Sequence, residues 1–182
     1  MDRRAVVDTA VGILGRLGLP DLTMRRLGTE LGVQQSAIYH HFANKQELLG
    51  AVADEILARG PHRDLEDAAS WLDTVEACCA DVHAAVLAYS DGADVVSSMF
   101  AFGFGGQEAY DRLRKALAGT GLGDEVEAVA ARTLLHYVYG HAIAHQAAEQ
   151  AARVGAIEPE SAPDDFEAGL GFILAGIVAA TT

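Results

Sequence analysis

A short polar stretch at residues 34–40 carries the side chains with the clearest chemical use in this sequence. A glutamine amide can bond adenine through a donor and an acceptor, and an alanine can contact the methyl group of thymine. Tyrosine and histidine side chains are long enough to reach phosphate oxygens. These groups suit the major groove of DNA if one helix face presents them together. The set comprises Gln34, Gln35, Ser36, Ala37, Tyr39 and His40.

Groups on either side of this stretch suit contacts with the phosphates of the same duplex. Lys45 supplies a positive charge, and the backbone amides near Asn44 open the next expected helix, where anions bind. Thr23 and Arg25 offer a second contact from the helix before. We therefore expect a phosphate clamp, which positions a protein on DNA while base contacts specify the sequence.

Three histidines lie on one expected helix, and their spacing allows two interpretations. His141 and His145 are four residues apart, which is compatible with metal ligation from one helix face. Since no carboxylate or thiol is placed beside them, we favour helix packing or pocket lining for both and for His136. The isolated His62 and His83 are expected to be satisfied by neighbours. No metal or other cofactor is expected.

The spacing of residues 22–49 predicts a helix-turn-helix that supplies the helix face required by the polar set. Thr23 can cap its first helix, and Gly32 can end it. A second short helix follows over about 35–41, and Asn44 caps the next. The small core that fixes the angle between the two helices is expected to comprise Leu27, Leu31, Val33, Ile38 and Phe42.

Apolar residues recur at helical spacing along the chain without strand-like alternation, so an all-α fold is expected. A first helix ends at Gly18, and its buried face comprises Val6, Ala10, Ile13, Leu14 and Leu17. The fourth helix buries Leu48, Leu49, Val52 and Ile56. The strongest break follows at Gly60-Pro61. We therefore expect a helix-turn-helix domain over 1–60 and a larger helical domain over 61–182.

The second expected domain begins after a charged connector from Arg63 to Asp67. Its helices are expected at about 70–89, 107–118, 125–153 and 165–180. Between Asp91 and Gly106 we expect a short helix and then an apolar loop, in which three phenylalanines either cover a ligand or close the core. Glycines in the last helix each cost ~1 kcal/mol relative to alanine, so close helix approach is expected there. These glycines are Gly169, Gly171 and Gly176.

Charge is unevenly distributed over the 182 residues, whose formal net charge is −13. Residues 1–50 hold six basic and five acidic residues, whereas the rest hold seven and 21, so a polyanion must meet the N-terminal part.

Charged first residues and uncharged runs of at most 16 residues predict neither a secretory signal nor a membrane span. Adjacent Cys78 and Cys79 predict no disulfide, which suits the cytoplasm. They act either as small hydrophobes or as oxidant sensors.

The segment LTMRRLGTELGVQQSAIYHHFANKQELL, residues 22–49, resembles the DNA-binding domain of TetR-family transcriptional repressors. The resemblance covers about residues 3–60 and departs from the family at Gly28, where alanine is usual. It implies a homodimer in which three N-terminal helices bind half of a palindromic operator and a C-terminal domain binds an effector. The DNA contacts that it implies are Thr23, Arg25, Gln34, Gln35, Ser36, Ala37, Tyr39, His40, His41 and Lys45.

The C-terminal part resembles the body of the tetracycline repressor in EILARG, SWLDTVEACCADVHAAVLAYSDGADV and LLHYVYGHAIAHQAAEQ. In the tetracycline repressor, a histidine binds magnesium, a glutamate holds the metal's waters and an asparagine contacts the drug. The resemblance aligns these three residues with Val96, Ala144 and Cys78 of this chain, respectively. Since these polar anchors are absent, it implies a fairly apolar effector rather than magnesium–tetracycline. The effector contacts expected are His62, Cys78, Val82, Val96, Phe100, Phe104, His136, Tyr137 and His141.

The sequence therefore favours a ligand-responsive transcriptional regulator, most simply a repressor released from its operator by a small molecule. The helices at about 125–153 and 165–180 are expected to form its homodimer. Since the sequence contains no Gly-x-Ser-x-Gly elbow, P-loop or His-Glu-x-x-His motif, no enzyme is expected. The alternative is a helical protein that binds a small molecule or a metal and whose N-terminal part does not bind DNA. The acidic charge favours that alternative slightly, and the intact helix-turn-helix pattern opposes it.

Overall fold

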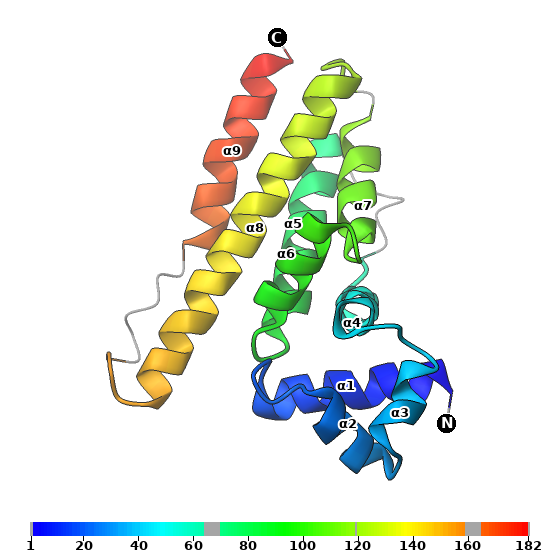
Figure 1. Ribbon diagram of the computed structural model, residues 1–182. Coiled ribbons are helices and arrows are strands. Elements are labelled where there is room, and N and C mark those ends of the chain that lie inside the picture. Colours follow the sequence, from blue (N-terminus) through cyan, green and yellow to red (C-terminus); the bar gives the residue numbers. More distant parts are fainter. Residues whose placement is uncertain (1, 64–69, 119, 159–164, 182) are drawn as a thin grey trace. The chain divides into compact units, whose positions relative to one another are not determined.

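The computed structural model describes residues 2–63, 70–118, 120–158 and 165–181, and over these residues the fold is all-α, as expected (Figure 1). No residue in these ranges is in a β-strand. None of the helices there is long and apolar enough to cross a membrane. The helices are α1 (Arg3–Leu17), α2 (Met24–Leu31), α3 (Gln35–Tyr39), α4 (Lys45–Arg59), α5 (Trp71–Leu87), α6 (Gly92–Phe102), α7 (Gln107–Leu117), α8 (Asp124–Arg153) and α9 (Phe166–Ala180).

The chain divides into two compact units, here called the first unit and the second unit. The first unit comprises Met1–Gly60 together with Ala85–Gln107, and the second comprises Pro61–Ala84 together with Glu108–Thr182. A boundary therefore falls at the expected break after Gly60, but α6 and the end of α5 pack with the N-terminal helices. Of the expected charged connector from Arg63 to Asp67, only Arg63 is among the described residues.

Local capping explains where the first helices begin and end. The side chain of Asp2 accepts a hydrogen bond from the Ala5 amide at 2.8 Å, and α1 ends at Gly18, whose φ of 82° is unfavourable for other residues. Val6, Ala10, Ile13 and Leu14 are fully buried, as expected. Leu17 was wrongly placed on that buried face. It is 42% exposed because the helix stops there, one turn beyond the last core position.

The loop after α6 lies against α4 within the first unit. A Cβ atom at Gly50 would lie 2.2 Å from the Phe104 carbonyl oxygen, so only glycine permits this approach. The Asp54 side chain accepts a hydrogen bond from the Gly106 amide at 2.7 Å. The expected short helix and loop between residues 91 and 106 are thus confirmed, and the loop is fixed to α4 by backbone contact.

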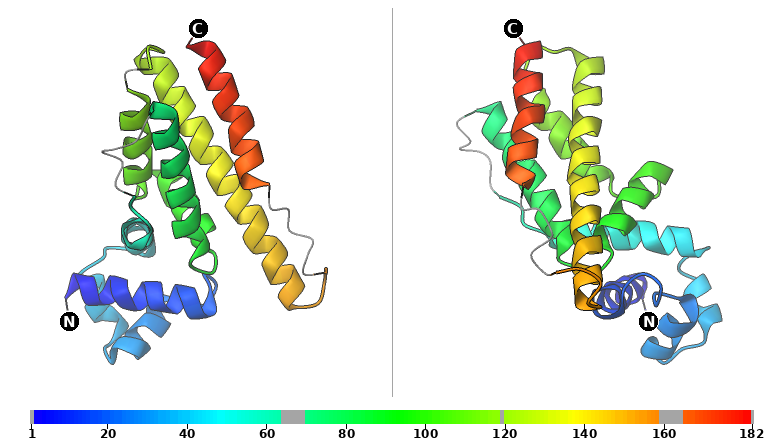
Figure 2. Two further views of the ribbon diagram at one scale, coloured as in Figure 1. Left: turned by 180° about the vertical axis from the view of Figure 1, so that it is seen from behind. Right: turned by 90° about the vertical axis from the view of Figure 1, so that its left-hand side faces the viewer.

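The second unit has a core of aliphatic side chains from α5, α7 and α8. Figures 1 and 2 show α9 alongside α8 and running in the opposite direction. Close helix approach is confirmed at Gly169, where a Cβ atom would lie 2.1 Å from the Tyr137 hydroxyl oxygen. At Gly171 and Gly176 a Cβ atom would meet none of the described atoms within 4 Å. The buried core residues of this unit include Val75, Cys79, Leu113, Leu117, Leu134, Leu135 and Val138.

Candidate nucleic-acid interface and effector cavity

The helix-turn-helix forms as its capping residues and core predict. The Thr23 side chain accepts a hydrogen bond from the Arg26 amide at 3.1 Å, and Gly32 ends α2 in the left-handed conformation with φ 66°. Leu27, Ile38 and Phe42 have no exposed surface, so they hold α3 against α2. Of the other expected core residues, Leu31 and Val33 are half-buried, because they lie at the turn.

The turn into α3 approaches α2 closely at Gly28. A Cβ atom there would lie 3.0 Å from the Val33 carbonyl oxygen and 3.4 Å from the Gln35 amide nitrogen. The Val33 amide donates to the Gly28 carbonyl oxygen at 2.9 Å. The glycine found where the family usually has alanine therefore suits a tight contact, which an added methyl group would have to widen by a few tenths of an ångström.

The polar set of α3 lies at the surface of the first unit. Tyr39 is 45% exposed, and its hydroxyl group lies 3.3 Å from the Gln35 side-chain amide, which donates to it. Gln34, Ser36 and His40 are exposed as well, and Ala37 and His41 are half-buried. The structure thus brings the expected base-contacting side chains together on one short helix and its flanks. This arrangement can present amide, hydroxyl, imidazole and methyl groups to a DNA groove.

The expected phosphate clamp is only partly available. The Glu47 carboxylate accepts from the Ala43 amide at 2.7 Å, and the Asn44 side chain accepts from the Glu47 amide at 2.8 Å. This capping box already satisfies two backbone amides near Asn44. Lys45 is half-buried and Arg25 is exposed, and no carboxylate of the described residues lies within 4.0 Å of either. These two side chains are therefore the available cations beside α3.

Other arginines of the first unit are engaged with carboxylates. Arg16 pairs with Glu30 at 2.7 Å, and Arg26 pairs with Asp21 at 2.8 Å. Arg3 lies over the Phe42 ring, 4.5 Å from its centroid. Because these cations already have partners, the positive potential of the first unit is concentrated near Arg25 and Lys45.

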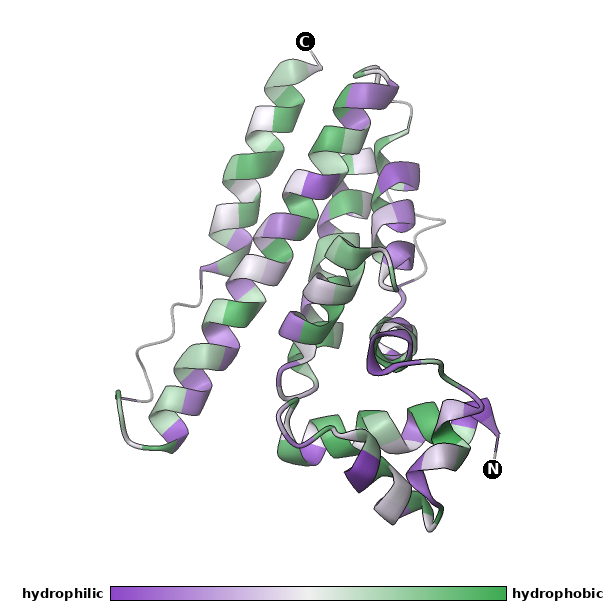
Figure 3. Ribbon diagram, viewed as in Figure 1, coloured by the Kyte–Doolittle hydropathy of each residue, from purple (hydrophilic) through white to green (hydrophobic). Residues whose placement is uncertain are grey.

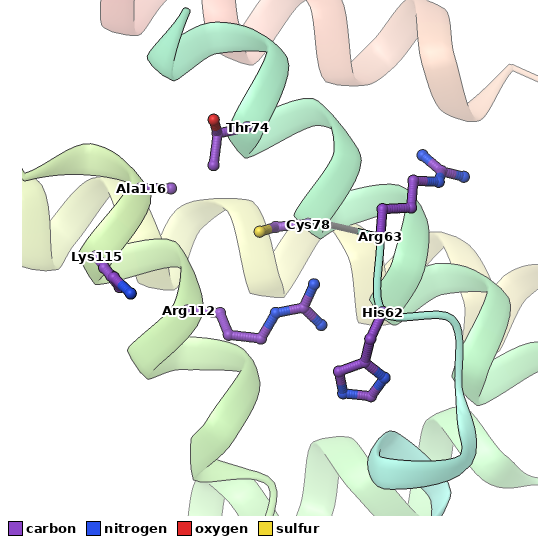
Figure 4. Close-up of a pocket in the computed structure, with 7 residues that line it drawn as sticks. All are labelled: His62, Arg63, Thr74, Cys78, Arg112, Lys115 and Ala116. Carbon is purple, nitrogen blue, oxygen red and sulfur yellow. The ribbon is translucent and has the colours of Figure 1, made fainter. Parts of the chain in front are cut away.

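The second unit contains a cavity of about 460 Å³ between α5, α7 and the residues that precede α5 (Figure 4). Two of the expected effector contacts, His62 and Cys78, line it. The lining also contains three basic side chains that were not expected there from the sequence. The full lining is His62, Arg63, Thr74, Cys78, Arg112, Lys115 and Ala116.

A buried carboxylate lies beside this cavity and orients two of its arginines. Asp81 is 1% exposed, and its carboxylate lies 3.0 Å from Arg112 Nη2 and 3.3 Å from Arg63 Nε. It also accepts a hydrogen bond from the Arg63 amide at 3.2 Å. A buried carboxylate requires such partners, since a charge without them is strongly destabilising. A second carboxylate orients the His62 side chain, whose Nε2 lies 3.3 Å from Glu108 Oε1.

Both cysteines are buried, and neither is activated. Burial raises the pKa of the Cys78 thiol, although the nearby Arg112 guanidinium opposes this. Burial raises the pKa of the Cys79 thiol to about 12. Since the thiolate is the reactive form, these cysteines act as small hydrophobic side chains, and Cys78 presents its sulfur to the cavity.

Two further expected effector contacts belong to an aromatic cluster between α5, α8 and α9. Tyr137 donates to the Phe166 carbonyl oxygen at 2.8 Å, and His141 Nδ1 lies 3.0 Å from His83 Nε2. His83 stacks on the Phe166 ring with the centroids 3.9 Å apart. His141 Nε2 lies 3.3 Å from an Asp165 carboxylate oxygen. The packing interpretation of His83 and His141 therefore accounts for their contacts.

The remaining expected effector contacts are not among the residues that line the cavity. Val82 is buried in α5, and His136 is exposed on α8. Val96, Phe100 and Phe104 belong to the first unit, where Val96 is buried and Phe104 is 50% exposed. Among the described residues, no three histidine, cysteine, aspartate or glutamate side chains are grouped so that they could hold a metal ion.

Family models and solved structures were compared with the chain. The model for bacterial regulatory proteins of the tetR family matches residues 6–52, and the model for the tetracyclin repressor-like C-terminal domain matches residues 64–164. The class C tetracycline repressor protein of Escherichia coli is 40% identical over 52% of this chain and 44% of its own length. The chain thus spans less than half of that relative. The class A repressor protein from transposon 1721 of Escherichia coli is 32% identical over 94% of this chain and 88% of its own length.

Three solved structures are similar over nearly the whole chain. BioQ of Mycobacterium smegmatis is 38% identical with a TM-score of 0.90, over 99% of both chains. BioQ with its natural double-stranded DNA operator is 36% identical with a TM-score of 0.83, over 98% of this chain and 99% of the other. A TetR variant from Acinetobacter baumannii in complex with minocycline is 29% identical with a TM-score of 0.79, over 97% and 93%.

Proposed function

Because the chain belongs to the TetR family of bacterial regulatory proteins, we propose that it is a transcriptional repressor released from a palindromic operator by a small-molecule effector. The observation that carries this proposal is the exposed polar face of α3, held at a fixed angle by the fully buried Leu27, Ile38 and Phe42. The similarity to BioQ bound to operator DNA supports it. The protein acts in the cytoplasm and catalyses no reaction.

In the proposed complex, α3 enters the major groove. Gln34, Gln35, Ser36 and Ala37 contact base edges, whereas Tyr39, His40 and His41 contact bases or phosphates at the groove wall. Thr23, Arg25 and Lys45 contact phosphates on either side. With few available cations, the non-specific part of the affinity is modest, and base contacts account for more of the binding.

A homodimer formed by α8 and α9 presents two α3 helices to the two half-sites of the operator. Apolar side chains of both helices are exposed in the single chain: Phe172 is 81% exposed, Val178 40% and Ile143 38%. Figure 3 shows that α9 is hydrophobic along most of its length. Pairing of these surfaces removes them from water. For operator half-sites one helical turn apart, the two α3 helices must lie ~34–36 Å apart.

The effector binds in the second unit, at the cavity beside α5 and α7. The similarity to a TetR variant in complex with minocycline supports a small-molecule effector. Because α5 runs from the cavity residues Thr74 and Cys78 into residues that pack with the first unit, it offers a covalent route between the cavity and the helix-turn-helix. To release DNA, the effector must bind the DNA-bound and free forms unequally.

Fluorescence anisotropy tests this proposal directly. The full chain is titrated at ~150 mM salt onto labelled DNA from upstream of its own gene and onto scrambled DNA of the same length and composition. The upstream DNA of the neighbouring genes is included as a second probe. We expect binding to one of the specific sequences at least about 100-fold tighter than to scrambled DNA, equivalent to about 2.7 kcal/mol. Equal, weak binding to all of them would favour a ligand-binding protein that does not bind DNA specifically.

A further inference from the structure

From the lining of the cavity in the second unit we infer that its ligand is a small organic anion with an apolar body. This inference names the class of the effector and to that extent rests on the proposed function. It departs from the fairly apolar effector that the sequence implied. The few basic residues of the C-terminal part are unevenly distributed, and this distribution favours an anion.

Basic side chains are concentrated at this cavity although the surrounding sequence is strongly acidic. Residues 51–182 contain seven lysines and arginines, and three of them line the cavity: Arg63, Arg112 and Lys115. Among the described residues, no aspartate or glutamate lines it. In the part of the chain that the structure describes, the lining pairs with two carboxylates from outside: Asp81, beside Arg63 and Arg112, and Glu108, beside His62. Of the described residues, three cations thus face two carboxylates, which leaves a positive charge for a ligand.

Arg112 is the best oriented of these cations. Its side chain is 23% exposed, and Nη2 is held 3.0 Å from the buried Asp81 carboxylate. An arginine has five N–H donors in a rigid planar fork, so the contact with Asp81 and the one with Cys78 leave further donors for a ligand. Figure 4 shows the guanidinium group between Cys78 and His62, inside the ring of lining residues. Asp81 therefore positions Arg112 rather than using up its hydrogen-bonding capacity.

The rest of the lining suits the uncharged part of such a ligand. Cys78, Thr74 and Ala116 present a thiol, a small hydroxyl-bearing side chain and a methyl group. Lys115 on α7 is exposed and one turn from Arg112, so it can meet the same anionic group at its solvent side. A planar carboxylate or a sulfonate suits the arginine fork. A neutral apolar molecule would displace water from the N–H donors that Asp81 does not satisfy and would give them no acceptor in return.

Two fluorescent probes distinguish the contribution of the ligand's negative charge to binding from the contribution of its apolar body. The first, 8-anilinonaphthalene-1-sulfonate, carries a sulfonate, and the second, N-phenyl-1-naphthylamine, has the same rings without it. We expect the wild-type chain to bind the sulfonate at least about tenfold more tightly than the neutral probe. We expect Lys115→Gln to weaken sulfonate binding about threefold to tenfold and to change binding of the neutral probe less than about twofold.

A double variant tests Arg112 without leaving a buried charge. Asp81→Asn with Arg112→Gln removes one charge of each sign, so the net charge of the chain is unchanged and the pair is lost together. We expect its sulfonate affinity to fall more than about tenfold. Arg153→Gln is the matched control for loss of one positive charge, because Arg153 is exposed on α8, outside the cavity. It should bind both probes as the wild type does.

The outcomes separate this inference from the proposed function. It is overturned if the wild type does not bind the sulfonate below ~100 μM, if both probes bind equally, or if Arg153→Gln weakens sulfonate binding as much as Lys115→Gln. The same preparations are tested for binding to upstream DNA. Specific DNA binding with no preference for the sulfonate would refute the anionic ligand alone. A cavity-dependent sulfonate preference without specific DNA binding would instead refute the repressor.

Discussion

The carboxylate of Asp91 accepts a hydrogen bond from the backbone amide of Leu19, 2.7 Å away, and so joins the start of α6 to the end of α1. Asp91 has φ 57°, a left-handed conformation that aspartate and asparagine tolerate better than most residues. Gly18 leaves room for this contact, because a Cβ atom there would lie 2.7 Å from the same carboxylate oxygen. A movement of α6 therefore acts directly on α1.

The other end of α6 is joined to α4 by the bond from the Gly106 amide to Asp54 and by the close approach of Phe104 to Gly50. Within the first unit, α6 is thus fixed to the helix before the recognition elements and to the helix after them. Both ends of α6 are therefore coupled to the helices that flank α2 and α3 in the sequence.

Replacement of Asp91 by alanine tests the first connection. The variant loses a charge-assisted hydrogen bond and places alanine at positive φ, so we expect the free energy of unfolding to fall by about 1.5–3 kcal/mol. Urea unfolding followed by circular dichroism measures this change. Asp91→Asn keeps an acceptor oxygen and tolerates the conformation, and it should lose less than half as much. Equal losses for the two variants would show that the contact with Leu19 contributes little.

Replacement of Tyr39 by alanine tests the assignment of α3 as the recognition helix. Tyr39 is 45% exposed, and its described contact is with Gln35, so the fold should persist. We expect specific DNA affinity to fall at least about tenfold, since one specific contact contributes ~1–3 kcal/mol. Anisotropy on specific and scrambled DNA measures the loss. Tyr110→Ala, on α7, is the control for loss of a tyrosine, and an equal effect of both variants would contradict the assignment.

The two cations beside α3 are expected to control the salt dependence of binding. Arg25→Gln and Lys45→Gln should each weaken binding to specific and scrambled DNA alike, and each should reduce the slope of log K against log salt by about 1. Titrations at several salt concentrations give this slope. Arg26→Gln is the control. Because Arg26 already pairs with Asp21 at 2.8 Å, its replacement should change the slope less. A larger effect of Arg26 would place the phosphate contact elsewhere.

The helix-turn-helix was predictable from sequence because local chemistry determines it. Thr23, Gly32 and Asn44 each act on the backbone within four residues, and all three cap or end helices as expected. The face of α3 follows from Ile38 being buried, since this fixes which of its neighbours are exposed. Leu17 was misplaced because its apolar character continues the pattern of α1 beyond the last turn that packs against the core.

The cavity was not predictable in the same way. Arg63 and Arg112 are 49 positions apart in the sequence, and they come together only because both approach the buried Asp81. In the sequence, Arg112 and Lys115 have the spacing of an ordinary solvated helix face. The expected contacts were transferred from a resemblance, and the structure places Val96 and Phe104 in a different unit from His62. Long-range packing therefore determines this site, and the pattern of residue types does not reveal it.

Both cysteines are expected to resist thiol reagents while the chain is folded. Burial raises the pKa of Cys79 to about 12, so at pH 8 its thiolate fraction is on the order of 10⁻⁴, against about a quarter for a free cysteine. Reaction with 5,5′-dithiobis(2-nitrobenzoate) should be at least about 100-fold slower in buffer than in urea. Cys78→Ser isolates Cys79 as a control. Rapid reaction of the folded chain would instead support the oxidant-sensing interpretation.

Replacement of Phe172 tests whether α9 forms the proposed dimer interface. Phe172 is 81% exposed in the single chain, and a partner that buried it would contribute about 1.5–3 kcal/mol of association free energy per side chain. A symmetric dimer contains this contact twice, so Phe172→Asp should raise the dimer dissociation constant at least about 100-fold. Sedimentation velocity over a range of concentrations measures this. Phe102→Asp is the matched control, because Phe102 is 66% exposed but lies in the first unit. A dimer weakened by Phe102→Asp and unaffected by Phe172→Asp would place the interface away from α9.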